Sequence, residues 1–341
     1  MMPHSAEPAN PKAPFRTMTA CLAISDQSIA KAVTILAAGQ LVAFPTETVY
    51  GLGADATNAA AVARIFAAKQ RPAFNPLISH VASADAAFAL GQKTPIAAAL
   101  AAAFWPGPLT LVLQRNDDGP VAILTTAGLD KIGIRFPAHR GAQTLLQAFG
   151  KPIAAPSANP SGRISPSTAK HVLDGLDGRL DLVLDGGSCE SGLESTIIDC
   201  TGDIARMLRP GGITRDALAA ALAAANCNPQ IDIAEPLADH ENPVAPGQLA
   251  SHYAPKAPVR LMAKTSTADE ELIGFGTVSG FGKLALNLSP SGDLVEAAAN
   301  LFSMLHAVDA ADIAKIAIAP IPDTGLGEAI NDRLRRAAAP R

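Results

Sequence analysis

The sequence predicts an α/β protein, with an open, twisted, mixed sheet flanked by helices in its larger N-terminal part and a smaller α/β domain after it. From about Ser25, short apolar runs alternate with helical patterns. Several successive apolar runs have no helix between them, which predicts a mixed rather than an all-parallel sheet. A proline-rich stretch then separates this region from a second, shorter alternation.

The first region has strand and helix signals in regular succession. Short apolar segments bounded by Gly, Pro or Asn predict strands at 41–44, 76–81, 109–114, 132–136, 152–155, 180–185, 195–199 and 205–209. The predicted helices are Ser28–Ala38, Ala59–Lys69, Ile96–Phe104, Ala142–Phe149, Thr168–Leu173 and Thr214–Ala225. Thr57 is expected to cap the second helix, and Pro72 prevents its continuation. We therefore expect a first domain over 21–225, after a disordered tail at 1–20.

Residues 226–258 form the predicted linker, because they hold six prolines and no helix or strand periodicity. Connections of this length are usually functional or disordered. Beyond the linker, VRLMA (259–263), ELIGFG (271–276) and IAKIAIAPI (313–321) predict strands. Helices are expected at Asp293–Ala310 and Glu328–Ala338, so residues 259–341 predict a small βαβ-type, Rossmann-like domain.

Composition bounds the function. A hydrophobic content of 48% suffices for genuine cores, and a formal net charge of −4 means that any anion site must be local. The four cysteines lack C-x-x-C or zinc-site spacing, so we expect reduced thiols and no metal held by protein side chains. The N-terminus lacks a signal-peptide core, and the apolar run at 96–105 is too short to span a bilayer. These features predict a cytoplasmic protein without membrane association.

Loops at predicted strand ends hold most of the polar residues suited to a site, and ligands of open α/β sheets bind outside the carboxyl ends of strands. In FPTETVYGLGADATN (44–58), Gly51 and Gly53 permit close backbone approach or positive φ. This segment has neither a G-x-G-x-x-G nor a Walker pattern, so it does not by itself predict a nucleotide site.

The segment KQRPAFNPLISH (69–80) places two cations beside a stiff turn. Arg71 and Asn75 each precede a proline, which favours extended geometry. Arg is suited to bidentate phosphate contacts and Lys69 to a point-charge contact. The same cations would also suit the C-terminus of any helix, and this simpler interpretation stays open.

Two further segments carry candidate ligands. Arg135 lies in an apolar strand, where it either faces water on an edge or binds a carboxylate. The segment PIAAPSANPSGRISPST (152–168) offers hydroxyls and amides before a helix, as an anion or ribose cradle, although Ser165 or Ser167 would also serve as an N-cap. Ser195 and Arg209 follow in ESTIID and LRPGG.

Together these segments supply cations and hydroxyls, at Lys69, Arg71, Arg135 and Arg209 among others. They contain no nucleophile with a matched base, and their carboxylates form no obvious acid–base pair. This inventory favours binding a polyanion while two substrates are aligned, as in phosphoryl or nucleotidyl transfer.

In this order, FPTETVYGLG, KQRPAFNPLISH, FWPGPLT, GIRFP, APSANPSG and ESTIID resemble the YrdC-type L-threonylcarbamoyladenylate synthases. PGQLASHYAP (246–255) and GLGEAINDRLRRAA (325–338) resemble the linker and C-terminal motifs of their long, two-domain form. The resemblance covers about 25–338 and implies a YrdC-like first domain. It also implies a reaction, in which L-threonine, bicarbonate and ATP give L-threonylcarbamoyl-AMP and pyrophosphate for threonylcarbamoyladenosine modification of tRNA next to the anticodon.

The resemblance also implies a set of site residues. Those expected to bind ATP are Lys69, Arg71, Asn75, Lys131, Ser157, Asn159, Ser165 and Arg209. Those expected to bind L-threonine are Thr48, His80, Arg135, Ala155 and Ser195. Without the resemblance, His80 would be interpreted as a satisfied core histidine. Mg²⁺ would arrive with ATP, no prosthetic group is implied, and the proteins that transfer the product to tRNA would be partners, with weak direct tRNA binding as a further expectation.

Two positions depart from the family pattern. Lys131 stands where the family usually has threonine, so a backbone contact to ATP could survive but a hydroxyl contact could not. In the linker motif, Gln248 and Ala250 reduce the usual bulk, whereas His252 and Tyr253 remain. We therefore expect His252 and Tyr253 to cover the site as a lid that excludes water.

Two other functions would use some of the same features. A carbamoyltransferase of the hydrogenase-maturation type shares the YrdC-like domain, but its cysteine-rich zinc modules and acylphosphatase-like region have no counterpart here. A non-catalytic RNA-binding module would use the same basic cleft. The net charge of −4 argues against strong nonspecific RNA affinity, and one Trp and two Tyr supply few rings for base stacking.

Overall fold

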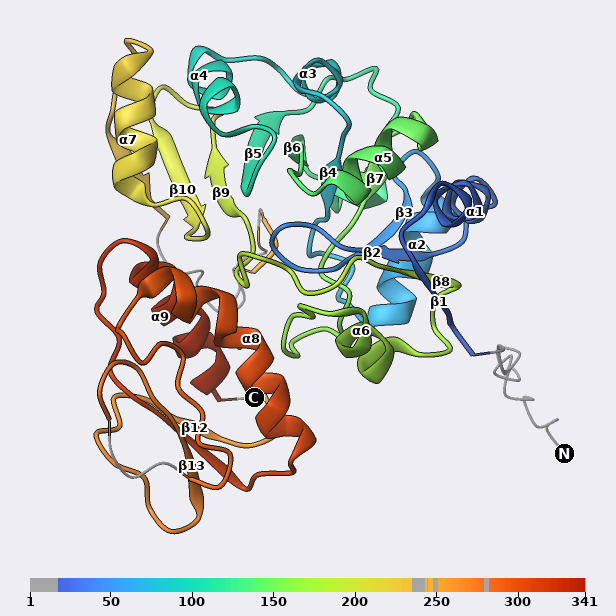
Figure 1. Ribbon diagram of the computed structural model, residues 1–341. Helices are drawn as coiled ribbons and strands as arrows, with labels where there is room; N and C mark the ends of the chain where they lie inside the picture. The colour runs from blue at the N-terminus through green and yellow to red at the C-terminus, as the bar shows by residue number, and fades with distance from the viewer. Residues whose placement is uncertain (1–17, 235–242, 244, 248–250, 279–281, 341) are drawn as a thin grey trace, which may run out of the picture.

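The computed structural model describes residues 18–234, 243, 245–247, 251–278 and 282–340, and it contains two sheets (Figure 1). The larger sheet has the order β1 (Ala20–Ala23), β8 (Leu182–Asp185), β2 (Val42–Phe44), β3 (Gly51–Asp55), β7 (Ile153–Ala154), β4 (Ile78–His80), β6 (Lys131–Arg135), β5 (Leu109–Gln114), β9 (Thr196–Asp199), β10 (Ala205–Arg209) and β11 (Ile231–Ile233). The sheet contains both parallel pairs, such as β4–β6, and antiparallel pairs, such as β5–β6, so the predicted mixed sheet is confirmed.

Helices cover both faces of this sheet. They are α1 (Asp26–Ala37), α2 (Ala59–Lys69), α3 (Ala84–Leu90), α4 (Pro95–Phe104), α5 (Arg140–Phe149), α6 (Ala169–Leu176) and α7 (Arg215–Ala224), with a 3₁₀ turn η1 (Ile123–Thr126). The apolar faces of α1 and α5 pack on one side, and α2, α4, α6 and α7 pack on the other. Alternate residues of β8 enter the two cores, which explains its continuous apolar sequence.

Local capping differs from two of the predictions. Asn58 caps α2, whereas Thr57 donates its hydroxyl to Asp55. Thr168 caps α6, so neither Ser165 nor Ser167 has the expected capping role. Each cap lies within three residues of the predicted one. Several polar side chains near each helix start are able to cap it, and the sequence does not show which of them accepts the backbone N–H groups.

Several elements were not predicted. They are β1, β3, β11, α3 and η1. The strand β3 lies in the segment that we interpreted as a loop, and its glycines serve close packing rather than positive φ. A Cβ atom on Gly53 would lie 2.8 Å from the Phe44 ring and 2.9 Å from Ile153. The strand β11 lies in the predicted linker and pairs with β10.

The second sheet has the order β12 (Val259–Arg260), β14 (Lys315–Ile318), β13 (Glu270–Ile273), with parallel pairs. The helices α8 (Leu294–Ala310) and α9 (Leu326–Ala338) pack on it, and the predicted small α/β domain is confirmed. In Figure 1, α8 and α9 lie on the side of this domain that faces the larger sheet. Residues 1–17 of the expected disordered tail, and Gln248 and Ala250, lie outside the described residues. The expectation is wrong for the end of the tail at residue 20, because Thr19 is buried and hydrogen-bonded and Ala20 begins β1.

Candidate active site

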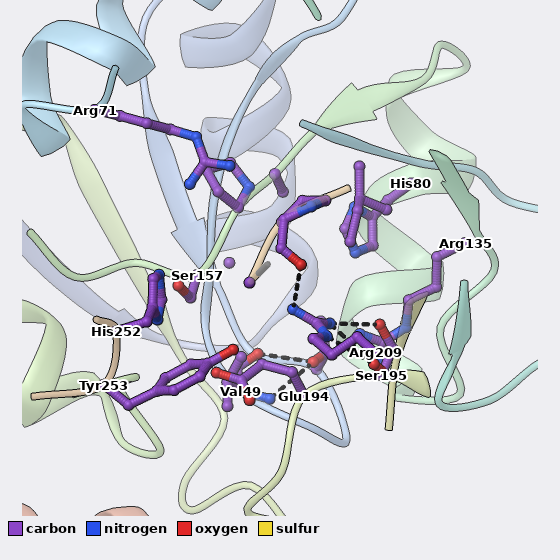
Figure 2. Close-up of a pocket in the computed structure, with 17 residues that line it drawn as sticks. Val49, Arg71, His80, Arg135, Ser157, Glu194, Ser195, Arg209, His252 and Tyr253 are labelled. Carbon is purple, nitrogen blue, oxygen red and sulfur yellow. Dashed lines mark hydrogen bonds between the residues drawn. The ribbon is translucent and has the colours of Figure 1, made fainter. Parts of the chain in front are cut away.

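A cavity lies where the loops of the larger sheet meet the linker (Figure 2). The lining comes from the segment between β2 and β3 with the start of β3, the loop between α2 and β4, and the strands β4, β6 and β10. The segments after β7 and before β9 and the linker complete it. The predicted site residues that line it are Arg71, His80, Arg135, Ala155, Ser157, Ser195, Arg209, His252 and Tyr253. Segments that range from Thr46 to Tyr253 in the chain therefore meet at one place.

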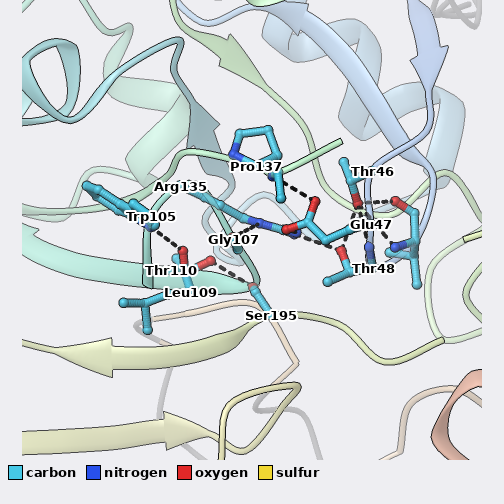
Figure 3. Close-up of polar contacts among 12 residues, drawn as sticks. Thr46, Glu47, Thr48, Trp105, Gly107, Leu109, Thr110, Arg135, Pro137 and Ser195 are labelled. Carbon is cyan, nitrogen blue, oxygen red and sulfur yellow. Dashed lines mark hydrogen bonds and ion pairs between the residues drawn. The ribbon is translucent and has the colours of Figure 1, made fainter. Parts of the chain in front are cut away.

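Arg135 is anchored on one side of this cavity (Figure 3). Its Nη2 lies 2.7 Å from Glu47 Oε1, its Nη1 donates to Thr48 Oγ1 at 2.8 Å, and its Nε donates to the Gly107 carbonyl. The edge-strand alternative is wrong, because β6 lies between β4 and β5 and Arg135 is buried. Burial would raise the pKa of Glu47, but Arg135 holds it below its usual range. A guanidinium has five N–H groups, so these three contacts leave two of them over.

Arg71 is held by the turn that follows it. Its Nη2 donates to Asn75 Oδ1 at 2.5 Å and to the Pro76 carbonyl at 2.8 Å, and its Nε donates to the Asn75 carbonyl. The Asn75 N–H donates to the Pro72 carbonyl at 3.2 Å, and this turn brings the acceptors back toward Arg71. Asn75 thus orients Arg71, and Arg71 itself lines the cavity.

Arg209 lies near the centre of the view in Figure 2 and joins the sheet to the linker. It donates from Nη2 and Nε to the Ser195 carbonyl at 2.9 and 3.2 Å, and from Nη1 to the Pro246 carbonyl at 3.3 Å. The Ser195 hydroxyl is 3.1 Å from the same Nη2 and 2.7 Å from Thr110 Oγ1. Ser195 is therefore fixed by two neighbours.

His80 ends β4 and is buried beside Phe44, whose ring it meets edge-on with centroids 6.1 Å apart. Burial and the neighbouring Arg135 lower the pKa of His80 to about 3, so the imidazole is neutral at physiological pH. Its Nδ1 has no hydrogen-bond partner among the described residues. The Ala155 N–H already donates to the Ile78 carbonyl, so this amide is engaged within the sheet.

The other predicted site residues do not line the cavity in the described part of the chain. All of them except Lys131 belong to the hydrogen-bond network that supports the residues lining it. Lys69 donates its ammonium to the carbonyls of Ser157 and Asn159. The Asn159 amide donates to the Pro160 and Arg163 carbonyls, and Ser165 donates to Glu194 Oε1. Thr48 supports Arg135, as described above, and Lys131 lies 2.8 Å from Asp199 Oδ2.

The electrostatics of the cavity favour an anionic ligand. Burial, the larger cause, and nearby cations lower the pKa values of Lys69, Arg71 and Arg209. Within the described ranges, none of the three forms an ion pair with a carboxylate. A bound polyanion would offset the cost of these buried charges.

Several unsatisfied polar atoms belong to side chains that line the cavity or support its lining. Among the described residues, buried atoms without a partner include Asn75 Nδ2, His80 Nδ1, Asn159 Oδ1, His252 Nδ1 and the Tyr253 hydroxyl. Buried polar groups are normally paired, so this concentration indicates a ligand site. No group of three or more His, Cys, Asp or Glu side chains in the described ranges is arranged to hold a metal ion.

Sequence reasoning missed the partners of the site's cations. Glu47 neutralises Arg135, and Glu194 lines the cavity beside Ser195. Arg333, from α9, reaches Glu194 Oε2 at 2.7 Å. Arg333 is one of three arginines in a charged helix, and nothing in the sequence distinguishes the buried one. Only the C-terminal motif GLGEAINDRLRRAA pointed to this region.

Comparisons with known proteins agree with this arrangement. The family model of the Sua5, YciO and YrdC proteins, described as "Telomere recombination", matches residues 34–211. A second family model, "Threonylcarbamoyl-AMP synthase, C-terminal domain", matches residues 213–339. The chain therefore belongs to the Sua5/YciO/YrdC family, in the form that carries this C-terminal domain.

Similar proteins match either nearly the whole chain or its N-terminal part. Threonylcarbamoyl-AMP synthase of Bacillus subtilis is 40% identical over 344 residues, covering 96% of this chain and 97% of the relative. The crystal structure of Pyrococcus abyssi Sua5 complexed with L-threonine has a TM-score of 0.83 and 36% identity, covering 94% of this chain and 97% of that one. Escherichia coli YciO has a TM-score of 0.53 and 25% identity, covering 57% of this chain and 96% of that one. The predicted fold class and family resemblance are confirmed.

Proposed function

We propose that the protein is an L-threonylcarbamoyladenylate synthase, which converts L-threonine, bicarbonate and ATP to L-threonylcarbamoyl-AMP and pyrophosphate. The observation that carries the proposal is the cluster of Arg71, Arg209 and Lys69, buried without carboxylate partners among the described residues, beside the separately anchored Arg135. One part of the cavity thus suits a polyphosphate and another an amino-acid carboxylate.

In this proposal, Arg71 and Arg209 contact the ATP phosphates and Ser157 contacts the nucleotide, since all three line the cavity. Lys69, Asn75, Asn159 and Ser165 complete the site mainly by holding these groups in place. We assign no side-chain contact with ATP to Lys131, because its ammonium is engaged by Asp199.

The threonine subsite is proposed around Arg135. Its remaining N–H groups bind the substrate carboxylate, and Ser195, held by Arg209 and Thr110, binds a polar group of threonine. Thr48 keeps Arg135 in place, and neutral His80 offers a hydrogen bond without adding charge. Substrate selectivity then rests on fixed donors, which reject analogues that leave them unpaired.

The chemistry proposed for this site needs no protein nucleophile. The amine of L-threonine combines with bicarbonate to give a carbamate and one molecule of water. A carbamate oxygen then attacks the ATP α-phosphorus, and the bond from this phosphorus to the pyrophosphate leaving group breaks. Arg71 and Arg209 stabilise the charge that builds on the phosphates, and the two subsites hold the reacting oxygen near the phosphorus. Mg²⁺ is proposed as a companion of ATP, because the described lining offers cations and hydroxyls. The carboxylates of Glu194, in the lining, and of Glu47, beside Arg135, are already paired with arginines.

The linker is proposed as a lid between a catalytic domain at 21–225 and the domain at 259–341. His252 and Tyr253 are buried and line the cavity, and the Pro246 carbonyl accepts from Arg209. Closure over the substrates would exclude water, which competes for the activated carbamate.

The product is proposed to serve threonylcarbamoyladenosine modification of tRNA in the cytoplasm, through partner proteins that transfer the threonylcarbamoyl group. No helix in the described ranges is long and apolar enough to cross a membrane.

Pyrophosphate release tests the proposed reaction. The purified protein with Mg-ATP, bicarbonate and L-threonine should release pyrophosphate, and omission of threonine should abolish the release. Trypsin cleavage of the linker should slow when ATP and threonine are both present. Pyrophosphate release that is indifferent to threonine would contradict the assignment, and an unchanged cleavage rate would contradict the lid.

A further inference from the structure

The largest fully buried side chain described is Arg333, which belongs to α9 of the C-terminal domain but contacts the catalytic domain. Its Nε lies 2.7 Å from Glu194 Oε2, and its Nη2 donates to the Pro210 carbonyl at 2.9 Å. These two acceptors precede β9 and follow β10, respectively. One guanidinium therefore bridges two segments of the catalytic domain.

The same guanidinium contacts the lid. Its central carbon lies 5.1 Å from the centroid of the Tyr253 ring, a cation–π arrangement. The Tyr253 ring also contacts Phe302 of α8, with ring centroids 5.7 Å apart. The His252 N–H donates to the Arg336 carbonyl of α9 at 3.2 Å. Both lid residues are thus held by the C-terminal domain.

Glu194 connects Arg333 to the residues of the cavity. Its Oε1 accepts from Ser165 Oγ at 2.5 Å while its Oε2 receives Arg333. It directly precedes Ser195, whose carbonyl receives Arg209. Although burial would raise the pKa of Glu194, Arg333 is the main cause that holds it below its usual range and keeps the carboxylate charged.

We propose that Arg333 is a positioning residue of the active site, which holds Glu194 and the Tyr253 ring together and makes lid closure depend on the C-terminal domain. The proposal rests on the synthase function and the lid proposed above. It gives the C-terminal domain a specific role, because a buried charge that contacts three segments is satisfied only when all three are in place.

Two neighbouring residues of α9 separate this role from general stability. Arg333→Lys keeps a positive charge, but one ammonium cannot satisfy Glu194, Pro210 and the ring together. Leu334→Ala removes packing from the C-terminal core, where Leu334 is buried. We expect Arg333→Lys to raise the KM values for ATP and L-threonine about tenfold or more, with a smaller change in kcat. Leu334→Ala should lower Tm but leave both KM values within about twofold of wild type.

A double-mutant cycle tests the route through Glu194. If Arg333 acts through this carboxylate, Arg333→Met added to Glu194→Gln should change the KM values by less than about twofold, whereas each single variant has a large effect. The double variant removes both buried charges, so it serves the test even if Arg333→Lys does not fold. An additional tenfold rise (about 1.4 kcal/mol) in the double variant would overturn this route.

Trypsin cleavage after the exposed Lys256 gives a readout that does not depend on catalysis. We expect Arg333→Lys to be cleaved faster than wild type and than Leu334→Ala. Wild-type KM values in Arg333→Lys, or an equal KM rise in Leu334→Ala, would overturn the proposal. Wild-type protein without threonine-dependent pyrophosphate release would instead contradict the proposed reaction, and the cleavage rates would still test Arg333.

Discussion

Gly247 is the point at which the lid leaves no room for a side chain. Its φ is +86°, and an added Cβ atom would lie 2.9 Å from both Arg209 Cδ and the Tyr253 hydroxyl oxygen. Substitution Gly247→Ala therefore imposes left-handed strain of about 1–2 kcal/mol, before any steric cost. The strain acts on the closed lid, because an open linker is free to change φ.

This cost converts into a kinetic expectation. If substrates bind tightly only under the closed lid, a loss of about 1.4 kcal/mol raises their apparent dissociation constants about tenfold. We expect Gly247→Ala to raise the KM values for ATP and L-threonine by about tenfold or more in the pyrophosphate assay.

Gly292 provides a matched control. Its φ is +78°, but an added Cβ atom would have no neighbour within 4 Å. Gly292→Ala should therefore carry similar backbone strain and lower Tm, yet leave both KM values unchanged. Wild-type KM values in Gly247→Ala, with a Tm shift equal to that of Gly292→Ala, would refute the reasoning.

Further expectations concern single side chains. Arg71→Met should raise the KM for ATP by about tenfold to a hundredfold, the equivalent of one charge-assisted hydrogen bond, with little change for L-threonine; equal effects on both substrates would contradict separate subsites. Arg135→Met should do the reverse, and its loss should be smaller for threonine analogues without a carboxylate. Lys131→Ala should change the KM for ATP less than about threefold, because its partly exposed ion pair with Asp199 lies outside the cavity lining. The pKa of His80 is lowered to about 3, so its contribution to stability is complete above pH 6.5 and is lost as pH falls toward 3. His80→Phe should therefore reduce, by about 1.4 kcal/mol per pH unit, the fall in the free energy of unfolding between pH 6 and 4, as measured by chemical denaturation. An unchanged pH dependence of the free energy of unfolding would contradict this assignment.

Strongly patterned elements of the fold were predictable from the sequence. The helix Ala59–Lys69 and the strands 109–114 and 205–209 have the bounds expected from their apolar patterns and from the turn-forming residues around them. The strands β3 and β11 were not predictable, because GLGAD contains two glycines and β11 lies in a proline-rich segment. Their strand form comes from pairing with neighbours that are distant in sequence, which local pattern cannot indicate.

The candidate site divides in the same way. By itself, the sequence determined which residue types are available: cations and hydroxyls on loops at strand ends, without a nucleophile, and with motifs that resemble one family. Only the tertiary structure decided which of them line the cavity, such as Arg71 and Arg209, and which support it, such as Lys69 and Asn75. The same holds for Arg333, because its burial against Glu194 depends on the packing of one domain on another. A sequence shows which residues are charged, but the partners of these charges and their loss of solvent are decided only when distant segments meet.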